Sequence, residues 1–224
     1  MNRTVALLSI CVALAGTLQI GCAQAPTAST QELIKKAETG DAQAQFRLGS
    51  AYETGQGVGR DAGEAEKWYR RAAEAGLAEA QNSVGSILQA RGQFTEALPW
   101  YEKASNQGHA LATNNLAYLY DLGRGVTQDR RKGFELYSKA AELGWAEAMW
   151  NLANMYGAGQ LGHVDLVAAC TWTVRAQRFA DPNNRALQGH IRRVMPQLQR
   201  MLSAEQLATC KQDGESWMPQ AKKQ

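Results

Sequence analysis

Residues Gly157 to Gly162 match the spacing Gly-x-Gly-x-x-Gly, the glycine fingerprint that cradles the pyrophosphate of a bound dinucleotide. That chemistry requires a β-strand directly before the glycines and a helix directly after them. The residues before this motif carry Leu152 and Tyr156 at the four-residue spacing of a helix instead. We therefore interpret the motif as a loop between two helices and predict no cofactor.

Histidines and cysteines are the other side chains whose types could define a chemical site. His109, His163 and His190 show no i, i+4 pairing of the kind that a helical metal site uses. Cys170 and Cys210 have no nearby histidine at a metal-ligand spacing. We predict no metal site and no catalytic residue, and we interpret the histidines as surface or capping residues.

The elements that must position these residues recur along the chain. Glycines close consecutive units at Gly40, Gly76, Gly108 and Gly144, which are 36, 32 and 36 residues apart. A unit of this size cannot bury its apolar face alone and must stack on its neighbours. The glycines suit the left-handed conformation that ends a helix. The predicted units are residues 40–76, 77–108, 109–144 and 145–180.

Each unit resolves into two helices, called helix A and helix B here. Helix A carries small, aliphatic and aromatic residues at i, i+4 and i+8, which share one face of a helix: Ala44, Leu48, Tyr52; Ala80, Val84, Leu88; Ala112, Leu116, Tyr120; Ala148, Leu152, Tyr156. Helix B repeats a pair of large side chains and an alanine: Trp68, Tyr69, Ala72; Trp100, Tyr101, Ala104; Leu136, Tyr137, Ala140; Trp172, Thr173, Ala176. Asp61, Asp129 and Asp165 precede helix B, where a carboxylate caps free amide groups.

The combined pattern A-x-A-x-x-x-L-G-x-x-Y-x-x-G-x-G-V…W-Y-x-x-A-A-x-x-G resembles the Sel1-like repeat family, a relative of the tetratricopeptide repeat. The resemblance covers about residues 40–180, and the second unit looks more like a tetratricopeptide unit. It implies an all-α protein, a right-handed α/α solenoid of about four helical hairpins with a C-terminal helical cap. It also implies an adaptor or scaffold role, without naming a substrate.

The same resemblance raises one enzymatic alternative. Disulfide-rich secreted relatives of this family have been associated with β-lactam binding. The motifs Ser-x-x-Lys, Ser-Asp-Asn and Lys-Thr-Gly that such chemistry uses are absent from this sequence, as is a cysteine pair within each repeat. A β-lactam-binding hydrolase is therefore the least favoured interpretation.

The two ends of the array depart from the repeat. Residues 26–39 are predicted to form a linker and an N-terminal capping helix, and residues 181–217 the C-terminal capping helices. Asp181 and Pro182 indicate a helix start, Pro196 should kink or divide that helix, and Ser203 with Gln206 forms a capping box. Residues 218–224 are predicted to be a disordered tail.

The first 25 residues read as a signal peptide. A short basic segment precedes an apolar stretch over residues 5–20 that is too short for a convincing membrane span. Two outcomes stay open. Small residues suit signal peptidase and a soluble periplasmic product, whereas Gly21 and Cys22 resemble the end of a bacterial lipobox, which would place a lipid on Cys22. Gln19 departs from that motif, which prefers an aliphatic residue there.

Export places Cys170 and Cys210 in an oxidising compartment, where an even pair is a disulfide candidate. Cys170 occupies a helix B position that faces the following element, and Cys210 shares a face with Leu207 of the cap. A bond between them would tie the cap to the last repeat and contribute about 3–4 kcal/mol through the restricted unfolded chain. Two buried free thiols are the alternative.

Charge argues against a nucleic-acid partner. The net charge is only +3 over 224 residues. A basic surface is nevertheless expected at the C-terminal end, because the region holds Arg175, Arg178, Arg185, Arg192, Arg193 and Arg200 with a single acidic residue among them, Asp181. Anionic lipid, lipopolysaccharide, an acidic partner or plain solvent could face these arginines. No interleaved aromatic residues support base stacking.

The concave face of such a solenoid is lined by helix A. Its candidate binding residues are those pointing away from the Ala-Leu-Tyr face: Phe46, Ser50, Asn82, Ser86, Gln89, Asn114, Tyr118, Asp121, Trp150 and Asn154. Amide side chains can pair with the backbone of an extended peptide, and Tyr118 and Trp150 could act as rigid anchors. The alternative is that some of them pack between repeats.

The sequence thus predicts an exported adaptor that binds a protein or peptide in the periplasm or cell envelope. A structural lipoprotein of an export or assembly complex, attached through Cys22, is the second interpretation. Membrane contact is expected only through that lipid or the basic surface, and the oligomeric state is not specified.

Overall fold

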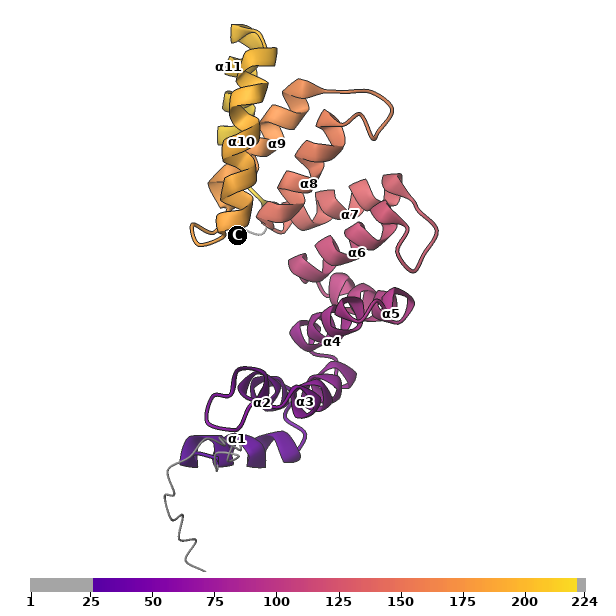
Figure 1. Ribbon diagram of the computed structural model, residues 1–224, viewed down its shortest axis with the longest axis vertical. Coiled ribbons are helices and arrows are strands. Elements are labelled where there is room, and N and C mark those ends of the chain that lie inside the picture. Colours follow the sequence, from indigo (N-terminus) through magenta and orange to yellow (C-terminus); the bar gives the residue numbers. More distant parts are fainter. Residues whose placement is uncertain (1–25, 221–224) are drawn as a thin grey trace, which may run out of the picture.

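The structure is a computed structural model that describes residues 26–220, which form eleven α-helices and no β-strand. The predicted signal peptide, with the lipidation candidate Cys22, and residues 221–224 lie outside the described residues. Helical hairpins stack one on another along the long axis of the molecule (Figure 1). The predicted all-α solenoid with a helical cap is confirmed.

The stack begins with α1 (Ala28–Glu38). Helix A of the four units is α2 (Ala42–Thr54), α4 (Ala78–Ala90), α6 (Ala110–Leu122) and α8 (Ala146–Gly157). Helix B is α3 (Ala62–Glu74), α5 (Phe94–Asn106), α7 (Arg130–Glu142) and α9 (Leu166–Phe179). The cap consists of α10 (Arg185–Met201) and α11 (Ala204–Ser216). Within residues 26–220, none of these helices is long and apolar enough to cross a membrane.

Helix boundaries follow the expected capping chemistry. The carboxylates of Asp61, Asp129 and Asp165 accept backbone N–H groups in the first turns of α3, α7 and α9 at 2.8, 2.9 and 2.9 Å. The glycines between the units have φ between 81° and 97°, a conformation that strains other residues. These short signals set the length of each hairpin and therefore the register in which the hairpins stack.

The two helices of a hairpin approach closely where a glycine on helix A faces a tyrosine ring on helix B. A Cβ built on Gly49 would lie 2.7 Å from the ring of Tyr69, and one built on Gly85 would lie 2.7 Å from the ring of Tyr101. Tyr101 is fully buried. The ring therefore fills the volume that a larger helix A residue would need, which packs each hairpin tightly.

The cap begins later than the sequence predicted. Asp181 and Pro182 do not start a helix, because the Asp181 carboxylate accepts the N–H of Asn183 and closes a turn. Asn184 is the N-cap of α10 instead, and its side-chain oxygen accepts the N–H of Leu187 at 3.1 Å. The Asn184 amide also donates to Glu147, so the start of the cap is fixed by unit four.

The predicted break at Pro196 is also absent, because α10 runs unbroken from Arg185 to Met201. Pro196 lies on the exposed side of the helix, where water can solvate the carbonyl that its missing N–H leaves free. The capping box between Ser203 and Gln206 forms as predicted. Residues 218–220 of the predicted tail are placed against the repeats instead, where Pro219 is buried and would lie 3.8 Å from a Cβ on Gly144.

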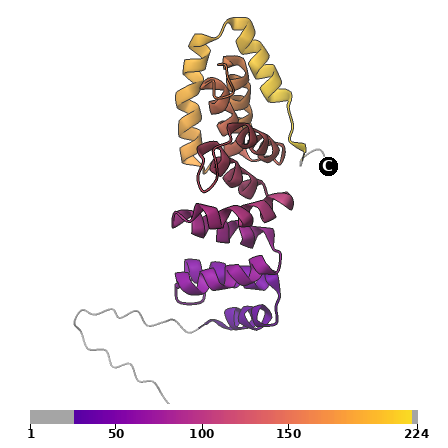
Figure 2. The same ribbon diagram turned by 90° about the vertical axis from the view of Figure 1, so that its right-hand side faces the viewer.

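The two cap helices straddle the last helix B. Both α10 and α11 pack against α9, and they diverge from their connection rather than forming a close hairpin (Figure 2). Gly214 of α11 lies so close to α9 that a Cβ there would come within 2.6 Å of Val174. The apolar face of unit four is therefore covered by two separate helices.

The glycine–tyrosine contact gives a stability prediction. Gly85→Ala should destabilise the protein by about 1–3 kcal/mol, because the added methyl group collides with the buried ring of Tyr101. Gly189→Ala is the matched control: a Cβ there would meet nothing within 4 Å, and alanine favours helix over glycine by up to about 1 kcal/mol. Urea unfolding of both variants measures the difference. Equal stability of the two would show that the close approach is unimportant.

Candidate functional site

The predicted binding residues of units one and two largely serve the repeats themselves. Phe46 is half-buried and packs against the ring of Tyr69, with the ring centroids 5.3 Å apart. The Tyr101 hydroxyl donates to the Gln89 side-chain oxygen at 3.0 Å and is hydrogen-bonded to the Ser86 hydroxyl at 3.3 Å. These contacts leave the first half of the predicted surface with few free polar groups.

An acidic residue of helix A lies near the tyrosine of helix B in units one and three. The Tyr69 hydroxyl donates to Glu53 at 2.7 Å with Ser50 beside it, and burial together with this carboxylate raises the pKa of Tyr69. Burial raises the pKa of the predicted binding residue Asp121, whose charge in turn helps to raise the pKa of Tyr137. Asp121 thus lies half-buried beside the repeat core.

Asparagines join successive A helices. The Asn115 amide donates to Asn82 at 3.2 Å, and the Asn151 amide donates to Asn114 at 3.1 Å. The two bonds are equivalent to each other: each runs from the seventh residue after the closing glycine to the sixth such residue of the preceding unit. The amide oxygens of Asn82 and Asn114 are therefore engaged between repeats, in line with the alternative that some predicted binding residues pack within the array.

The predicted residues nearest the C-terminal end have freer surroundings. Trp150 is half-buried and stacks on His190 of α10, with the ring centroids 5.7 Å apart and the planes at 25°. Asn154 is exposed one turn further along α8. Tyr118, in unit three, is half-buried under the Arg124 guanidinium, which lies 5.2 Å from the ring centroid.

Trp150 and Asn154 line a pocket of about 350 Å³ between α8, α9 and α10. No charged side chain lines this pocket, whose walls are apolar with neutral polar groups among them. The lining residues are Trp150, Ala153, Asn154, Gly157, Ala158, Gln160, Leu166, Ala169, Thr173, Val194, Gln197, Leu198 and Met201. Met201 is 64% exposed at its edge.

The pocket lies where the other units place a tyrosine. Units one to three carry Tyr69, Tyr101 and Tyr137 at one position of helix B, and unit four carries Thr173 there. Helix A also changes in unit four. The position that holds Glu53, Gln89 and Asp121 in units one to three holds Gly157 there. Thr173 and Gly157 both line the pocket. Unit four thus carries smaller side chains at both positions, and Thr173 is fully buried in the wall of the pocket.

The glycine motif at residues 157–162 forms the loop that the sequence predicted. Gly157 ends α8, Gly159 has φ of 65°, and the described part of the chain contains no strand before them. This loop therefore has no dinucleotide-binding geometry. Its residues contribute to the mouth of the pocket instead, through Gly157 and Gln160.

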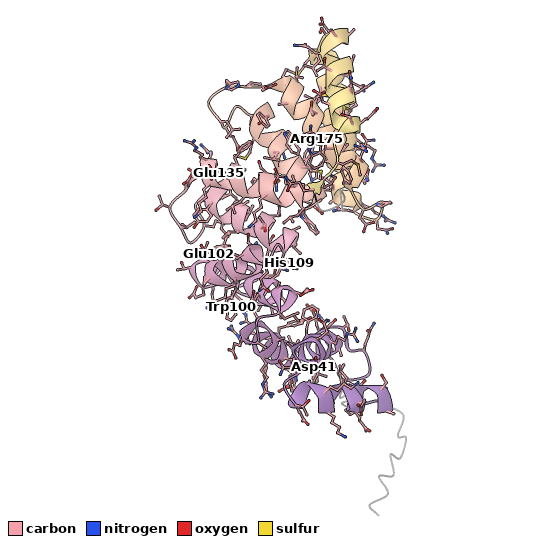
Figure 3. All side chains as sticks on the ribbon, turned by 180° about the vertical axis from the view of Figure 1, so that it is seen from behind. Asp41, Trp100, Glu102, His109, Glu135 and Arg175 are labelled. Carbon is pink, nitrogen blue, oxygen red and sulfur yellow. A yellow bond between two sulfur atoms is a disulfide. The ribbon has the colours of Figure 1, made fainter. Side chains whose placement is uncertain are left out.

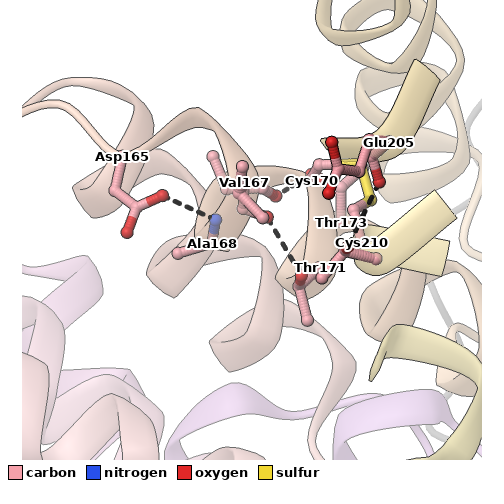
Figure 4. The surroundings of a disulfide bond; sticks show 10 residues. Asp165, Val167, Ala168, Cys170, Thr171, Thr173, Glu205 and Cys210 are labelled. Atoms are coloured by element: carbon pink, nitrogen blue, oxygen red, sulfur yellow. Dashed lines mark hydrogen bonds between the residues drawn. A yellow bond between two sulfur atoms is a disulfide. The ribbon is translucent and has the colours of Figure 1, made fainter. Parts of the chain in front are cut away.

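The cysteine pair lies at the base of the cap. A disulfide joins Cys170 of α9 to Cys210 of α11, with the Cα atoms 5.8 Å apart and both residues fully buried (Figure 4). Thr173, one turn further along α9, faces the pocket. The bond therefore fixes α11 on the helix that forms one wall of the pocket.

The arginines of the cap divide into two groups. Arg178 donates to the carbonyls of Gly214 and Trp217 at 3.0 and 2.9 Å, and Arg175 donates to the carbonyl of Asp213 at 3.3 Å. These two hold the C-terminal segment in place. The other group lies on α10 and consists of Arg185, Arg192, Arg193 and Arg200. None of these side chains makes a hydrogen bond or ion pair within residues 26–220.

The histidines fall at three separate places. His109 is the N-cap of α6, and its Nδ1 accepts the N–H of Ala112 at 3.2 Å (Figure 3). His163 is exposed in the loop after α8, and His190 stacks on Trp150. Among the described residues, no three His, Cys, Asp or Glu side chains gather as a metal-binding group.

Sequence reasoning missed the pocket although its signal is visible in the aligned units. The tyrosine of helix B is replaced at Thr173, and the acid or amide of helix A is replaced at Gly157. The sequence analysis also treated α10 as a plain cap. His190 follows Leu187 by three residues on α10, just as Asn151 follows Ala148 by three residues on α8. His190 also stacks on a residue of the preceding A helix. By this spacing and this contact, α10 continues the row of A helices.

Comparison with known proteins adds a family to this geometry. The family model described as Sel1 repeat matches residues 42–77, 78–109, 110–145 and 146–173, which make up more than half of the chain. These matches begin within two residues of the units predicted from the glycine spacing. No protein with a curated description matches the sequence.

Two solved structures show the same architecture. A protective antigen present in uropathogenic Escherichia coli strains, displaying an SLR fold, is 28% identical with a TM-score of 0.73; the match covers 83% of this chain and 39% of the antigen. A Sel1 repeat protein from Oxalobacter formigenes is 35% identical with a TM-score of 0.63; the match covers 68% of this chain and 65% of that protein. This chain thus spans less than two thirds of either relative.

The His109 cap predicts a pH dependence of stability. The cap needs a neutral imidazole, and burial lowers the pKa of His109 below its ordinary value of 6.5. The unfolded chain therefore binds more protons in this range, so the free energy of unfolding should fall as the pH drops from about 7 to 5. His109→Asn keeps a capping side chain but cannot titrate. Denaturant unfolding should show a smaller pH dependence in this variant; identical curves would rule the cap out.

Proposed function

This chain belongs to the Sel1 repeat family, whose members generally mediate protein–protein interaction, and we propose that it is an exported adaptor of the bacterial cell envelope. It would bind a protein or peptide on the face formed by the A helices. Its mechanism is the display of a rigid surface, in keeping with a fold that is typically a non-catalytic scaffold. A rigid surface binds a flexible partner without first having to order itself.

The pocket beside Trp150 is the observation that carries this proposal. Two of the ten residues chosen from the sequence, Trp150 and Asn154, line it together. A half-buried tryptophan beside an open apolar pocket is a typical anchor for a partner side chain. Binding is therefore proposed to concentrate at the C-terminal end of the array, with Tyr118 as a flanking contact.

Three observations support export to the envelope. The first 25 residues combine a basic start with a short apolar stretch, as secretory signals do. The Cys170–Cys210 disulfide suits an oxidising compartment. One structural relative is described as a protective antigen, which is consistent with a location outside the cytoplasm.

A structural lipoprotein is the second candidate, because Cys22 follows Gly21 as in a lipobox. The two candidates differ in how the chain is held in the envelope and share the binding face. A role in an export or assembly complex would fit the lipoprotein, whose solenoid would then project from the membrane surface.

Photo-crosslinking tests the binding face. Benzoylphenylalanine at position 154 should give discrete protein adducts in intact cells, whereas the same group at the exposed Lys35 of α1 should not. Trp150→Ala combined with Tyr118→Ala should reduce the adducts at least fivefold, because both anchors are lost. Asn154→Glu, an exposed change, should weaken capture of the same partner without altering the melting temperature. Adducts of equal strength at both positions would contradict this placement.

The intact mass of the protein recovered from cells tests export and distinguishes the two candidates. An exported soluble form should lack the signal peptide and carry no lipid. A lipoprotein should begin at Cys22, carry the mass of a lipid and incorporate labelled palmitate. In both forms Cys170 and Cys210 should resist alkylation until a reductant is added. Recovery of the uncleaved chain with Cys170 and Cys210 both alkylated before reduction would overturn the envelope location.

A further inference from the structure

The pocket between α8, α9 and α10 has a shape that indicates what it binds. We infer that it takes a large apolar, preferably aromatic, side chain of a partner peptide whose neighbouring residues are acidic. This inference rests on the proposed binding function and specifies the partner class. The argument has three parts: the origin of the pocket, the neutral polar groups on its walls, and the charge at its edge.

The origin of the pocket indicates an aromatic occupant. In units one to three the equivalent space holds a tyrosine ring that packs against Gly49, Gly85 or, in unit three, the equivalent Ala117. Unit four keeps the small residue, Ala153, but has Thr173 in place of the tyrosine. The helices α8 and α9 still pack as a hairpin, and the pocket lies beside the buried Thr173. A partner side chain can fill from outside the volume that the other repeats fill from within.

The polar groups on the walls favour a peptide over a lipid chain. Asn154, Gln160 and Gln197 all line the pocket, and none of their side chains makes a hydrogen bond within residues 26–220. Each amide offers a donor and an acceptor, as a peptide backbone does. An acyl chain in the same place would leave these groups unpaired, which costs binding energy. An extended peptide satisfies them while its side chain enters the slot.

The charge at the edge indicates acidic neighbours. Gln197 lines the pocket, and Arg193 and Arg200 lie four residues before it and three residues after it, so all three share one side of α10. Both arginines are exposed, and α10 contains no acidic residue. Carboxylates on either side of the inserted residue would therefore meet two cations that have no ion-pair partner among residues 26–220.

The other two arginines of α10 provide a matched control. Arg185 and Arg192 line a separate shallow surface with Pro182 and Gln188, on a different side of the helix from Gln197. Neutralising either pair changes the net charge of the protein equally. Only the pair at the pocket should affect a peptide bound there.

The probe is a fluorescein-labelled nonapeptide with a central phenylalanine flanked by glutamates, followed by fluorescence anisotropy at low salt. It should bind saturably, and replacing its phenylalanine by alanine should weaken binding at least tenfold. Arg193→Gln with Arg200→Gln should weaken it about tenfold, as two exposed charge pairs allow. Arg185→Gln with Arg192→Gln should change it less than twofold, and a peptide flanked by lysines should not bind.

Filling the slot tests its shape directly. Thr173→Tyr restores the side chain of the other units and should weaken binding of the phenylalanine peptide at least tenfold. Gly157→Gln serves as a second filler if the first variant misfolds, because a Cβ there meets only Ala169 at an ordinary 3.6 Å. Circular dichroism verifies the fold of each variant. Binding that survives both fillers would overturn the inference.

Other outcomes also decide the question. Equal weakening by the two arginine pairs would mean diffuse attraction and overturn the site. Binding of phosphatidylglycerol vesicles that depends on Arg193 and Arg200, without binding of the peptide, would mean a lipid surface and overturn the partner class. Discrete adducts at position 154 in cells, together with no affinity for the peptide, would overturn this inference and leave the proposed binding function intact.

Discussion

The contact on which this solenoid depends is a tyrosine of helix B lying against a helix A residue with little or no side chain. It appears as Tyr69 on Gly49 and as Tyr101 on Gly85, at distances that leave no room for a methyl group. Dense packing of this kind sets the separation of the two helices in each hairpin. Since every hairpin rests on the previous one, a constant separation is what allows the stack to continue.

That constraint explains why a pocket can arise at the end of the array and not in its middle. In units two and three the slot is filled, and the nearby asparagines bond across to the next unit. Unit four is followed by α10, which continues the row of A helices but is not paired with a helix B of its own, because α11 packs on α9 instead. The last slot can therefore stay open without weakening a following repeat. The Cys170–Cys210 bond fixes α11 on α9.

Much of the fold could be predicted from the sequence, because its causes are local. Glycine spacing fixes the units, Asp61 and its equivalents cap helix B, and the Ala-Leu-Tyr faces show which sides are buried. The start of the cap could not be predicted this way, since Asp181 and Pro182 form a plausible helix start by themselves. Asn184 is the cap in the structure because it also bonds Glu147, a contact between residues 37 apart in sequence.

The candidate site was only half predictable, and for a related reason. Selecting residues by helical face finds Trp150 and Asn154, but it also selects Asn82 and Asn114, whose oxygens are bonded between repeats. A helical face indicates which way a side chain points, but it does not show whether a neighbouring residue already bonds to that side chain. The more informative comparison is between equivalent positions of the repeat. Thr173 and Gly157 are each unremarkable alone, yet both depart from the repeat and both line the same pocket. In a repeat protein, paired departures from the repeat are therefore a stronger sign of a binding site than polar residues on an exposed face.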